Sequence, residues 1–546
     1  MPSAVQRYKR LLSAALARYF PHTTAYLRAE REAAVQLKKP APRAKKAASK
    51  GQSAGAKPSA NPRRAASKPR SQGIYGPAML TVEAAQAQAM REQVARAVTA
   101  GLLSAPSDEQ WAMILSNHPL TRIFAGAGSG KSTTLVLRVV FMFCHLGIKP
   151  EQLTVISFTN ASCAELREQL LKVLGFFNYP FDAAQARQSV RTFHSAMGSV
   201  AKSLLNNPRW FEQLDDPQAA SRELDNPLSA GRLRPAQQRL LKQAYQQCYA
   251  EQPAFRQKVH SLLQLPPPSD TGKRLPKAPL DTYKLAGEFS AAPLYEVFYT
   301  QAGFAESIGV ELSTMQPQRL DTAIPVREFL EALLLFWPYF QSALQEQGLL
   351  TFNAAFAQLT ARLNADGQGV AASLLAPFSH LLIDEFQDIS PQIVLWLQAV
   401  QRSLARRGQT VSLMAIGDDW QSIYAWRGSS PELFIDFDRH FPGKGQAKHS
   451  EVLNLSNNYR SIEAVIRDGE AVLAAVACKQ VKASQACKPT QTGDHGVKLI
   501  EDFDLNRQLP ELLAQIQVQC AYAGERQSRE PTAVLLLSRR NAPLQQ

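Results

Sequence analysis

Short apolar runs alternate with longer helix-like stretches from about residue 105 onward. The runs LTRIFAG, LTVISFT, HLLIDEF and VSLMAIGDD begin at residues 120, 153, 380 and 411. Their continuous apolar character predicts strands that are buried on both faces of a parallel sheet. Each run is followed by a loop and then by a helical pattern. This alternation indicates an α/β fold with a doubly wound parallel sheet.

Helical patterns dominate between residues 201 and 345. We interpret this segment as a helical insertion in the α/β domain, and its FWPYF run at 336–340 as core packing rather than a ligand contact. Residues 82–101 predict a further helix that ends at a glycine. The patterns divide the chain into a basic tail with a helix and a disordered linker at 1–75, a leading helix at 76–104, the α/β domain at 105–200 and 346–450, the helical insertion at 201–345, and the start of another domain at 451–546.

The net charge of +15 lies in the N-terminal tail. Residues 1–72 hold 17 Lys and Arg against two acids, whereas the remainder holds 44 basic and 44 acidic residues. Between residues 38 and 70 the chain has no acids and no aromatic residues, so we expect disorder. Such a segment could bind nucleic-acid phosphates, but a solvated linker explains its composition equally well. Any nucleic-acid function of the remainder therefore has to rest on motifs.

The six cysteines form no CxxC pair and are accompanied by no histidine cluster. We therefore expect no zinc site and a reduced, cytoplasmic location. No apolar run approaches the about 18 residues that a membrane span requires, so we expect no membrane partner. Arg18 interrupts the apolar residues near the N-terminus, which favours an amphipathic helix over a signal peptide.

A glycine-rich phosphate loop is the first candidate site. The segment AGAGSGKST at 125–133 follows a predicted strand and precedes a helical pattern, which is the context of a P-loop, although Ala125 lies where the strict pattern has glycine. Lys131 would reach the β- and γ-phosphates of a nucleotide, and Ser132 would bind Mg²⁺. The candidate nucleotide-binding residues of the loop are Ala125, Gly126, Ala127, Gly128, Ser129, Gly130, Lys131 and Ser132.

Two carboxylates follow the apolar run that begins at residue 380. In a doubly wound sheet, ligands bind at the carboxyl ends of the strands, so Asp384 could hold Mg²⁺ opposite Ser132. Glu385 could then orient and deprotonate a water molecule for attack on the γ-phosphate. A protein that only binds a nucleotide has no need of the second carboxylate, so the pair favours a hydrolase.

The segment GDDWQSIYAWRG at 417–428 combines two kinds of chemistry. Its carboxylates and glutamine suit a metal ion or a phosphate, whereas Tyr424 and Trp426 suit stacking on nucleic-acid bases. An aromatic residue taken singly belongs more often to a core. Arg427 could tie the segment to neighbouring acids.

The ordered motifs resemble those of the UvrD-like branch of superfamily 1 DNA helicases, which includes the UvrD, Rep and helicase IV types. The resemblance implies a RecA-like P-loop NTPase fold, with ATP and Mg²⁺ as cofactors. Seven ordered blocks carry it: SDEQ with Gln110, AGAGSGKS at 125–132, SFTNASCAELRE at 157–168, TFHS at 192–195, IDEFQD at 383–388, GDDWQSIYAWRG at 417–428 and NYRS at 458–461.

The resemblance also implies roles for residues outside the phosphate loop. Gln110 would recognise adenine, and Tyr459 would stack on it. Gln421 would sense the γ-phosphate, and Arg460 would stabilise the transition state, so both join Glu385 as expected catalytic residues. The residues that would contact single-stranded DNA are Phe158, Thr159, Asn160, Thr192, Phe193, His194, Tyr424 and Trp426.

By this resemblance we expect an ATP-dependent helicase or translocase that acts on single-stranded DNA or on single/double-strand junctions in the 3′ to 5′ direction. The helical insertion takes the place of the family's accessory 1B subdomain. Residues 451–546 resemble only the start of a second RecA-like domain, 2A, which in the family continues with further motifs. We therefore expect the chain to be C-terminally truncated. The alternative is an ATP- and DNA-binding module that does not unwind duplexes.

Overall fold

The protein is described here by a computed structural model. The chain divides into two compact units, a larger one of residues 1–461 and 476–488 and a smaller one of 462–475 and 489–546. Of the segment 1–75 that is predicted to be a basic tail, residues 1–72 lie outside the described residues. The structure describes residues 73–219, 222–225, 233–268, 276–285, 291–365, 369–473, 480, 483–492, 494–497 and 505–525.

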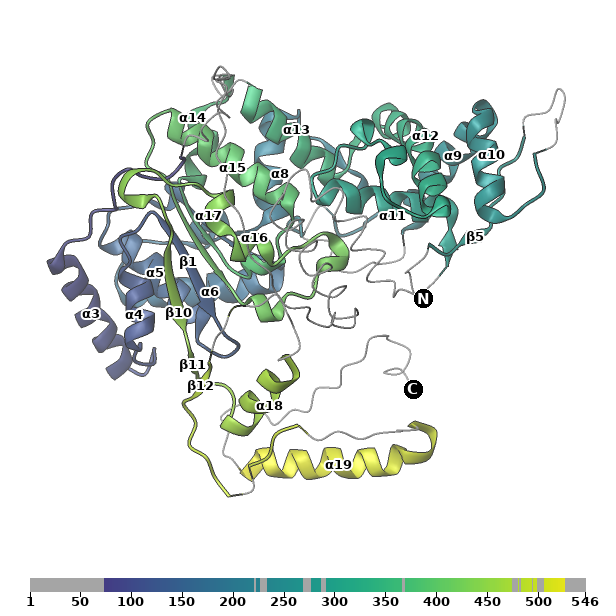
Figure 1. The fold of residues 1–546 in the computed structure, drawn as a ribbon. Coiled ribbons are helices and arrows are strands. Elements are labelled where there is room, and N and C mark those ends of the chain that lie inside the picture. Colours follow the sequence, from purple (N-terminus) through teal and green to yellow (C-terminus); the bar gives the residue numbers. More distant parts are fainter. Residues whose placement is uncertain are drawn as a thin grey trace, which may run out of the picture. The chain divides into compact units, whose positions relative to one another are not determined.

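A six-stranded parallel sheet forms the centre of the larger unit (Figure 1). Its strands lie in the order β10-β1-β9-β8-β2-β3. Four of its strands coincide with the four apolar runs, so the predicted α/β fold with a parallel sheet is confirmed. The strands are β1 Leu120–Ala125, β2 Leu153–Ser157, β3 Val190–Thr192, β8 His380–Ile383, β9 Ser412–Gly417 and β10 Glu451–Leu455.

Alternate side chains of the strands enter two hydrophobic cores. On one face, Phe124 and Ile383 pack with α8, α13 and α15, and on the other, Ile123 and Ile416 pack with α3, α4, α5 and α6. Because helices cover both faces, a ligand can reach the sheet only at the strand ends. These helices are α3 Ala84–Thr99, α4 Asp108–Leu115, α5 Lys131–Cys144, α6 Asn160–Phe176, α8 Phe193–Leu204, α13 Phe352–Ala365 and α15 Pro391–Arg406.

Four helices surround a third apolar cluster in the segment predicted to be a helical insertion. In α12 the aromatic residues Phe336, Trp337 and Phe340 are buried, which confirms that this run packs in a core. The short strands β4 Arg209–Trp210 and β7 Leu349–Leu350, which precede and follow these four helices in sequence, pair with each other. Its helices are α9 Pro235–Glu251, α10 Pro253–Leu263, α11 Leu294–Ser307 and α12 Ile324–Glu346.

Strand β10 follows the domain boundary that the sequence suggests at residue 450, yet it pairs with β1 at the edge of the sheet. The predicted division at that boundary stays a prediction. In the smaller unit, the described helices are α18 Glu463–Leu473 and α19 Leu505–Glu525. The remaining elements are α7 Ala183–Ser189, α14 Ala372–Leu375, α16 Glu432–Ile435, α17 Phe437–His440, and the strand pairs β5 Thr282–Tyr283 with β6 Ala292–Pro293 and β11 Asn457–Asn458 with β12 Gln485–Ala486.

The described residues can be checked for membrane-spanning helices and for paired cysteines. None of the helices in the described ranges has the length and apolar character needed to cross a membrane. The cysteines in these ranges are free thiols, namely Cys144, Cys163, Cys248, Cys487 and Cys520.

A buried carboxyl group, that of Glu212, lies in the short helix Phe211–Gln213, which follows β4. Its Oε1 accepts a hydrogen bond from the Phe352 backbone N–H at 2.9 Å, and its Oε2 is buried with no hydrogen-bond partner among the described residues. Burial, with a smaller contribution from Glu306, raises the pKa of Glu212 to about 8. The folded state therefore favours the protonated carboxyl group.

We predict that Glu212→Gln raises the free energy of unfolding at alkaline pH and changes it little near about pH 5. The folded pKa lies above the ordinary value of 4.5, so the stability that Glu212 contributes is present below that value and is lost as the pH rises to about 8. The loss approaches about 1.4 kcal/mol per pH unit in this window. Urea unfolding across the window measures the effect, with Asp215→Asn, an exposed neighbour, as the control. An unchanged pH slope in Glu212→Gln would contradict the prediction.

Candidate active site and nucleic-acid interface

The phosphate loop lies between β1 and α5. Gly128 and Gly130 have φ angles of 72° and 77°, in the left-handed region that favours glycine. A Cβ on Gly130 would lie 2.7 Å from Nε2 of Gln110. In the described chain no side chain caps α5, so the N–H groups of its first turn can bind an anion. Oγ of Ser129 is also buried, with no hydrogen-bond partner in the described ranges, so the loop fits a phosphate group.

Gln110 joins the start of α4 to this loop. Its Oε1 accepts from the Ser107 N–H at 3.0 Å, and its Nε2 donates to the Ser129 carbonyl at 3.1 Å. A side-chain amide has two donor hydrogens and two acceptor lone pairs, so one of each remains. Adenine presents an acceptor beside a donor on one edge. The predicted contact with adenine is therefore compatible with the second role of Gln110, which is to hold the loop.

An ion pair connects the phosphate loop to the end of β8. Nζ of Lys131 lies 3.0 Å from Oε1 of Glu385. Since β9 separates β1 from β8 in the sheet, the pair spans the carboxyl end of a third strand. Glu385 has a φ of 52°, which is a strained conformation for a residue with a side chain. Strain of this kind occurs most often at functional sites.

Burial and neighbouring charges set the protonation of this cluster. Burial alone lowers the pKa of Lys131, but the carboxylates of Glu385, Asp384 and Asp418 together outweigh it, and the resulting pKa is raised. Burial raises the pKa of Asp384 to about 6, with Glu385 adding to the effect and Lys131 opposing it. The Asp384 carboxylate is therefore destabilised, and a bound cation would stabilise its charged form.

Gln387 connects this acidic pair to the segment after β9. Its Nε2 donates to Oε2 of Glu385 at 2.8 Å, and its Oε1 accepts from the Asp418 N–H at 2.9 Å. A Cβ on Gly417 would lie 2.6 Å from that Oε1. Oδ2 of Asp418 in turn accepts from Nε2 of Gln421 at 2.6 Å. Gln421 and Glu385 are thus linked through Gln387, which the sequence offers only as one polar residue within IDEFQD.

The NYRS segment contacts the phosphate loop through its buried asparagine, Asn458. Nδ2 of Asn458 donates to the Ala127 carbonyl at 2.8 Å, and Oδ1 accepts from the Arg460 N–H at 2.9 Å. The Tyr459 N–H donates to the Gly128 carbonyl at 2.9 Å. The structure therefore brings Tyr459 and Arg460 to the loop within the larger unit. Asn458 is a further site residue, which only the long-range contact identifies.

An aromatic cluster follows the linked acids in the chain. The Tyr424 ring centroid lies 5.0 Å from that of Phe158 and 6.4 Å from that of Trp426. Phe158 is buried, whereas Trp426 is 47% exposed and available to stack on a base. Cζ of Arg427 lies over the Trp426 ring, 5.4 Å from its centroid. Nη1 of Arg427 is buried, with no hydrogen-bond partner among the described residues. Among the described residues, no ion pair joins Arg427 to an acid, and its guanidinium packs on an aromatic ring.

The polar residues expected to contact DNA already have partners within the chain. Thr159 and Thr192 are the N-caps of α6 and α8 and accept backbone N–H groups there. Thr192 also donates to the Leu224 carbonyl at 2.7 Å, and Nδ2 of Asn160 donates to the Glu223 carbonyl at 3.0 Å. Residues 222–225 therefore lie against both predicted contact segments.

Phe193 and His194 lie in the core beside the sheet. The His194 ring packs against Phe352 and Phe356, with ring centroids 4.9 Å and 5.5 Å away. Burial, together with the charge of Arg427, lowers the pKa of His194 to about 3, so its ring is neutral. The contact of these two side chains with DNA stays a prediction. They pack beneath the surface, where they position the start of α8.

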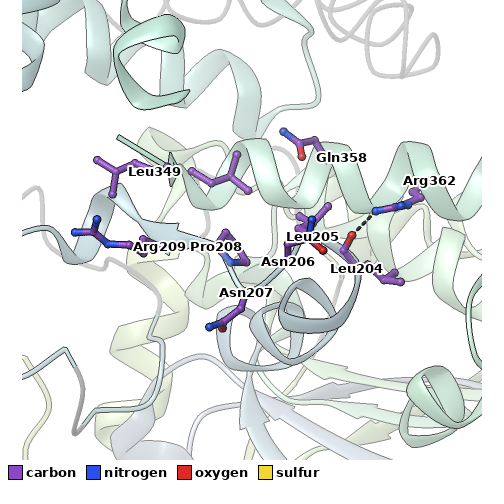
Figure 2. Close-up of a pocket in the computed structure, with 11 residues that line it drawn as sticks. Leu204, Leu205, Asn206, Asn207, Pro208, Arg209, Leu349, Gln358 and Arg362 are labelled. Carbon is purple, nitrogen blue, oxygen red and sulfur yellow. Dashed lines mark hydrogen bonds between the residues drawn. The ribbon is translucent and has the colours of Figure 1, made fainter. Parts of the chain in front are cut away.

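A separate cavity of about 510 Å³ opens beside the loop that follows α8 (Figure 2). Nη1 of Arg362 donates to the Leu204 carbonyl at its edge. None of the predicted site residues lines this cavity, so we assign it no part in the site. Its lining residues are 204–209, 348–350, Gln358 and Arg362.

We predict that Gly128→Ala detaches the NYRS segment from the loop. A Cβ on Gly128 would lie 2.6 Å from Cβ of Arg460 and 2.8 Å from Oδ1 of Asn458, and overpacking of this kind costs about 1–3 kcal/mol. Gly147→Ala is the matched control, since Gly147 has a φ of 66° and no atom within 4 Å of an added Cβ. Limited proteolysis should show faster cleavage after Tyr459 in Gly128→Ala only. Equal cleavage of both variants would refute the prediction.

Comparison with known proteins agrees with this geometry. DNA helicase IV of Escherichia coli (strain K12) is 24% identical over 340 residues, which cover 61% of this chain and 42% of that protein. DNA helicase II of the same strain is 25% identical over 380 residues, with shares of 68% and 41%. ATP-dependent DNA helicase UvrD1 of Mycobacterium tuberculosis (strain ATCC 25618 / H37Rv) is 26% identical over 378 residues, with shares of 68% and 40%.

The chain thus spans about two fifths of the length of the curated relatives it matches. A family model, that of the UvrD/REP helicase N-terminal domain, matches residues 107–442. That range contains the phosphate loop, the acidic pair and the aromatic segment, and it covers more than half of the chain. The chain belongs to the UvrD/Rep helicase family.

Proposed function

We propose that this chain contains the ATP-hydrolysing part of a motor that moves along single-stranded DNA. The observation that carries the proposal is the Lys131–Glu385 ion pair beside the phosphate loop, because it joins a phosphate-binding cation to a carboxylate that can act as a base. The names of the relatives, which are DNA helicases, support the same function. By family resemblance, movement is in the 3′ to 5′ direction, on single strands or at single/double-strand junctions, and the location is cytoplasmic.

In this proposal, phosphate binding rearranges the ion pair. The N–H groups at the start of α5 bind the phosphates, and Lys131 exchanges its carboxylate partner for them. Glu385 is then released to orient a water molecule and to accept its proton. Gln387 stays hydrogen-bonded to the other carboxylate oxygen of Glu385, Oε2, and this bond limits how far the Glu385 side chain can rotate.

Mg²⁺ is the metal ion that the proposal requires. Ser132 and Asp384 would hold the ion, which would supply charge neutralisation to the phosphates. The described part of the chain has no group of three or more His, Cys, Asp or Glu side chains arranged for a metal ion. Most ligands of the ion would therefore be phosphate and water oxygens, as is usual for Mg²⁺ in nucleotide sites.

The remaining predicted residues would complete the reaction and couple it to DNA. Tyr459 would stack on adenine, and Arg460 would stabilise the charge that develops on the phosphate. Gln421 would detect the γ-phosphate. A change at Gln421 would reach Tyr424, three residues further along the backbone, and Trp426, five residues further. A binding module without unwinding activity is the alternative, and a duplex-unwinding assay on this chain separates the two.

The proposal predicts ATP hydrolysis that single-stranded DNA stimulates. Glu385→Gln should keep nucleotide affinity and reduce turnover by about 10²–10⁴-fold, because it removes the general base but keeps the shape of the side chain. Lys131→Ala should instead weaken nucleotide binding. Lys172→Ala, at an exposed lysine of α6, is the control and should behave as the unaltered chain. Absence of DNA stimulation in the unaltered chain would refute the motor.

The proposal also predicts that Trp426→Ala weakens single-stranded DNA binding without changing the basal ATPase rate. Loss of one base-stacking ring costs about 1–3 kcal/mol, whatever the DNA sequence. Ile423→Ala is the matched control, because Ile423 is also exposed on this segment but has no aromatic ring. Fluorescence anisotropy with an oligonucleotide measures both. An equal loss of affinity in the two variants would show that stacking on Trp426 is not the cause.

A further inference from the structure

Residues 222–225, which we name the acidic strap, lie against the two segments expected to bind single-stranded DNA. Leu224 fixes the strap to α8 and to the residue that caps it. The Leu224 carbonyl accepts the Thr192 hydroxyl hydrogen at 2.7 Å. Its side chain packs against the hydrophobic core of the sheet, and a Cβ on Gly198 would lie 2.4 Å from its Cδ1. The close approach is possible because residue 198 is a glycine.

Asp225 places a carboxylate at the N-terminus of α6. Its two carboxylate oxygens lie 3.3 Å and 3.4 Å from the Asn160 backbone nitrogen, which donates to them. Helix α6 has 17 residues, and the N-terminus of such a helix carries a partial positive charge. A phosphate is the other common ligand of this kind of position. Asp225 therefore holds a place that suits a DNA phosphate.

Glu223 holds a second anion position on the same helix. Its Oε2 lies 2.6 Å from Nη2 of Arg167. The Arg167 guanidinium is fixed by two further hydrogen bonds to the Val190 carbonyl, at 2.9 Å from Nε and 2.6 Å from Nη2. A guanidinium held in this way is already oriented for an anion. The Glu223 carboxylate is one third exposed, so solvent ions and DNA phosphates can compete with it.

We propose that the acidic strap is an autoinhibitory cover: Glu223 and Asp225 occupy two phosphate positions of the nucleic-acid surface, and the backbone phosphates of single-stranded DNA displace them. This inference rests on the proposed function, because it takes DNA to be the ligand. The strap also engages the side chain of Asn160, because Nδ2 of Asn160 donates a hydrogen bond to the Glu223 carbonyl. DNA binding then requires an open strap, and the apparent affinity falls in proportion to the fraction of open chains.

The test is a double substitution, Glu223→Gln with Asp225→Asn, in the full chain. It keeps the size of both side chains and removes both charges. The dissociation constant for a single-stranded oligonucleotide should fall about tenfold, and the basal ATPase rate should stay unchanged. The matched control, Asp215→Asn with Asp321→Asn, makes the same change in net charge at two exposed acids. A dissociation constant equal to that of the control, or a higher one, overturns the strap.

Hydrogen exchange on the unaltered chain tests the same inference without a substitution. Adding the oligonucleotide should increase amide exchange at residues 222–225 while it protects the start of α6. Increased protection of both segments would overturn the strap, because it would show that DNA binds over it. The two proposals can fail separately: an unaltered chain that binds DNA with a closed strap refutes only the cover, whereas a chain and a double variant that both bind no DNA refute the motor as well.

Discussion

The Lys131–Glu385 ion pair is the contact on which the rest of the site depends. It exists because the sheet order places the loop after β1 and the residues after β8 at one edge, with β9 between them. Two charges in a poorly solvated place lose hydration, so each is held there by the other. In the proposed function, an arriving phosphate would offer Lys131 an equivalent partner and thereby release the carboxylate. The pair would thus keep both charges in position for the nucleotide.

In the proposed function, the same pair would explain why GDDWQSIYAWRG combines phosphate-type and base-type residues. Gln387 bonds to Glu385 on one side and to the Asp418 backbone on the other, and Asp418 bonds to Gln421. A rotation of Glu385 would disturb this chain of short hydrogen bonds, which ends three residues before Tyr424. The proposed coupling therefore needs no long mechanical path. It needs only that one carboxylate has two alternative partners, a lysine or a water molecule.

Local patterns in the sequence predict the parts of the structure that are set locally. The four buried strands and the phosphate loop follow from apolar runs and from glycine spacing, and the structure has them where the sequence indicates. Gln387 and Asn458 could not be predicted, because their roles depend on strands and loops that meet only in the folded chain. The inward orientation of Phe193 and His194 could not be predicted for a related reason: a motif identifies residues that occur together but does not say which of them face inward. The edge strand β10 was also missed. Partly buried and exposed residues alternate along it, so the strand has no continuous apolar run.

The charge balance suggests why such a surface would be covered. Outside the tail, the chain has equal numbers of basic and acidic residues. This part of the chain therefore offers no general electrostatic attraction for DNA, and local cationic positions have to bind the phosphates there. A partly buried cationic group with no anion beside it destabilises the folded chain. In the structure, Glu385 pairs with Lys131, Asp225 accepts from the α6 N-terminus, and Glu223 pairs with Arg167. Both proposed phosphate sites are thus held in shape by a carboxylate of the chain itself, and in both a phosphate binds by exchange rather than by entering an empty site. Exchange makes binding weaker than the contacts alone would allow, but it keeps the cations oriented between successive binding events, as a motor that repeatedly binds and releases its ligands requires.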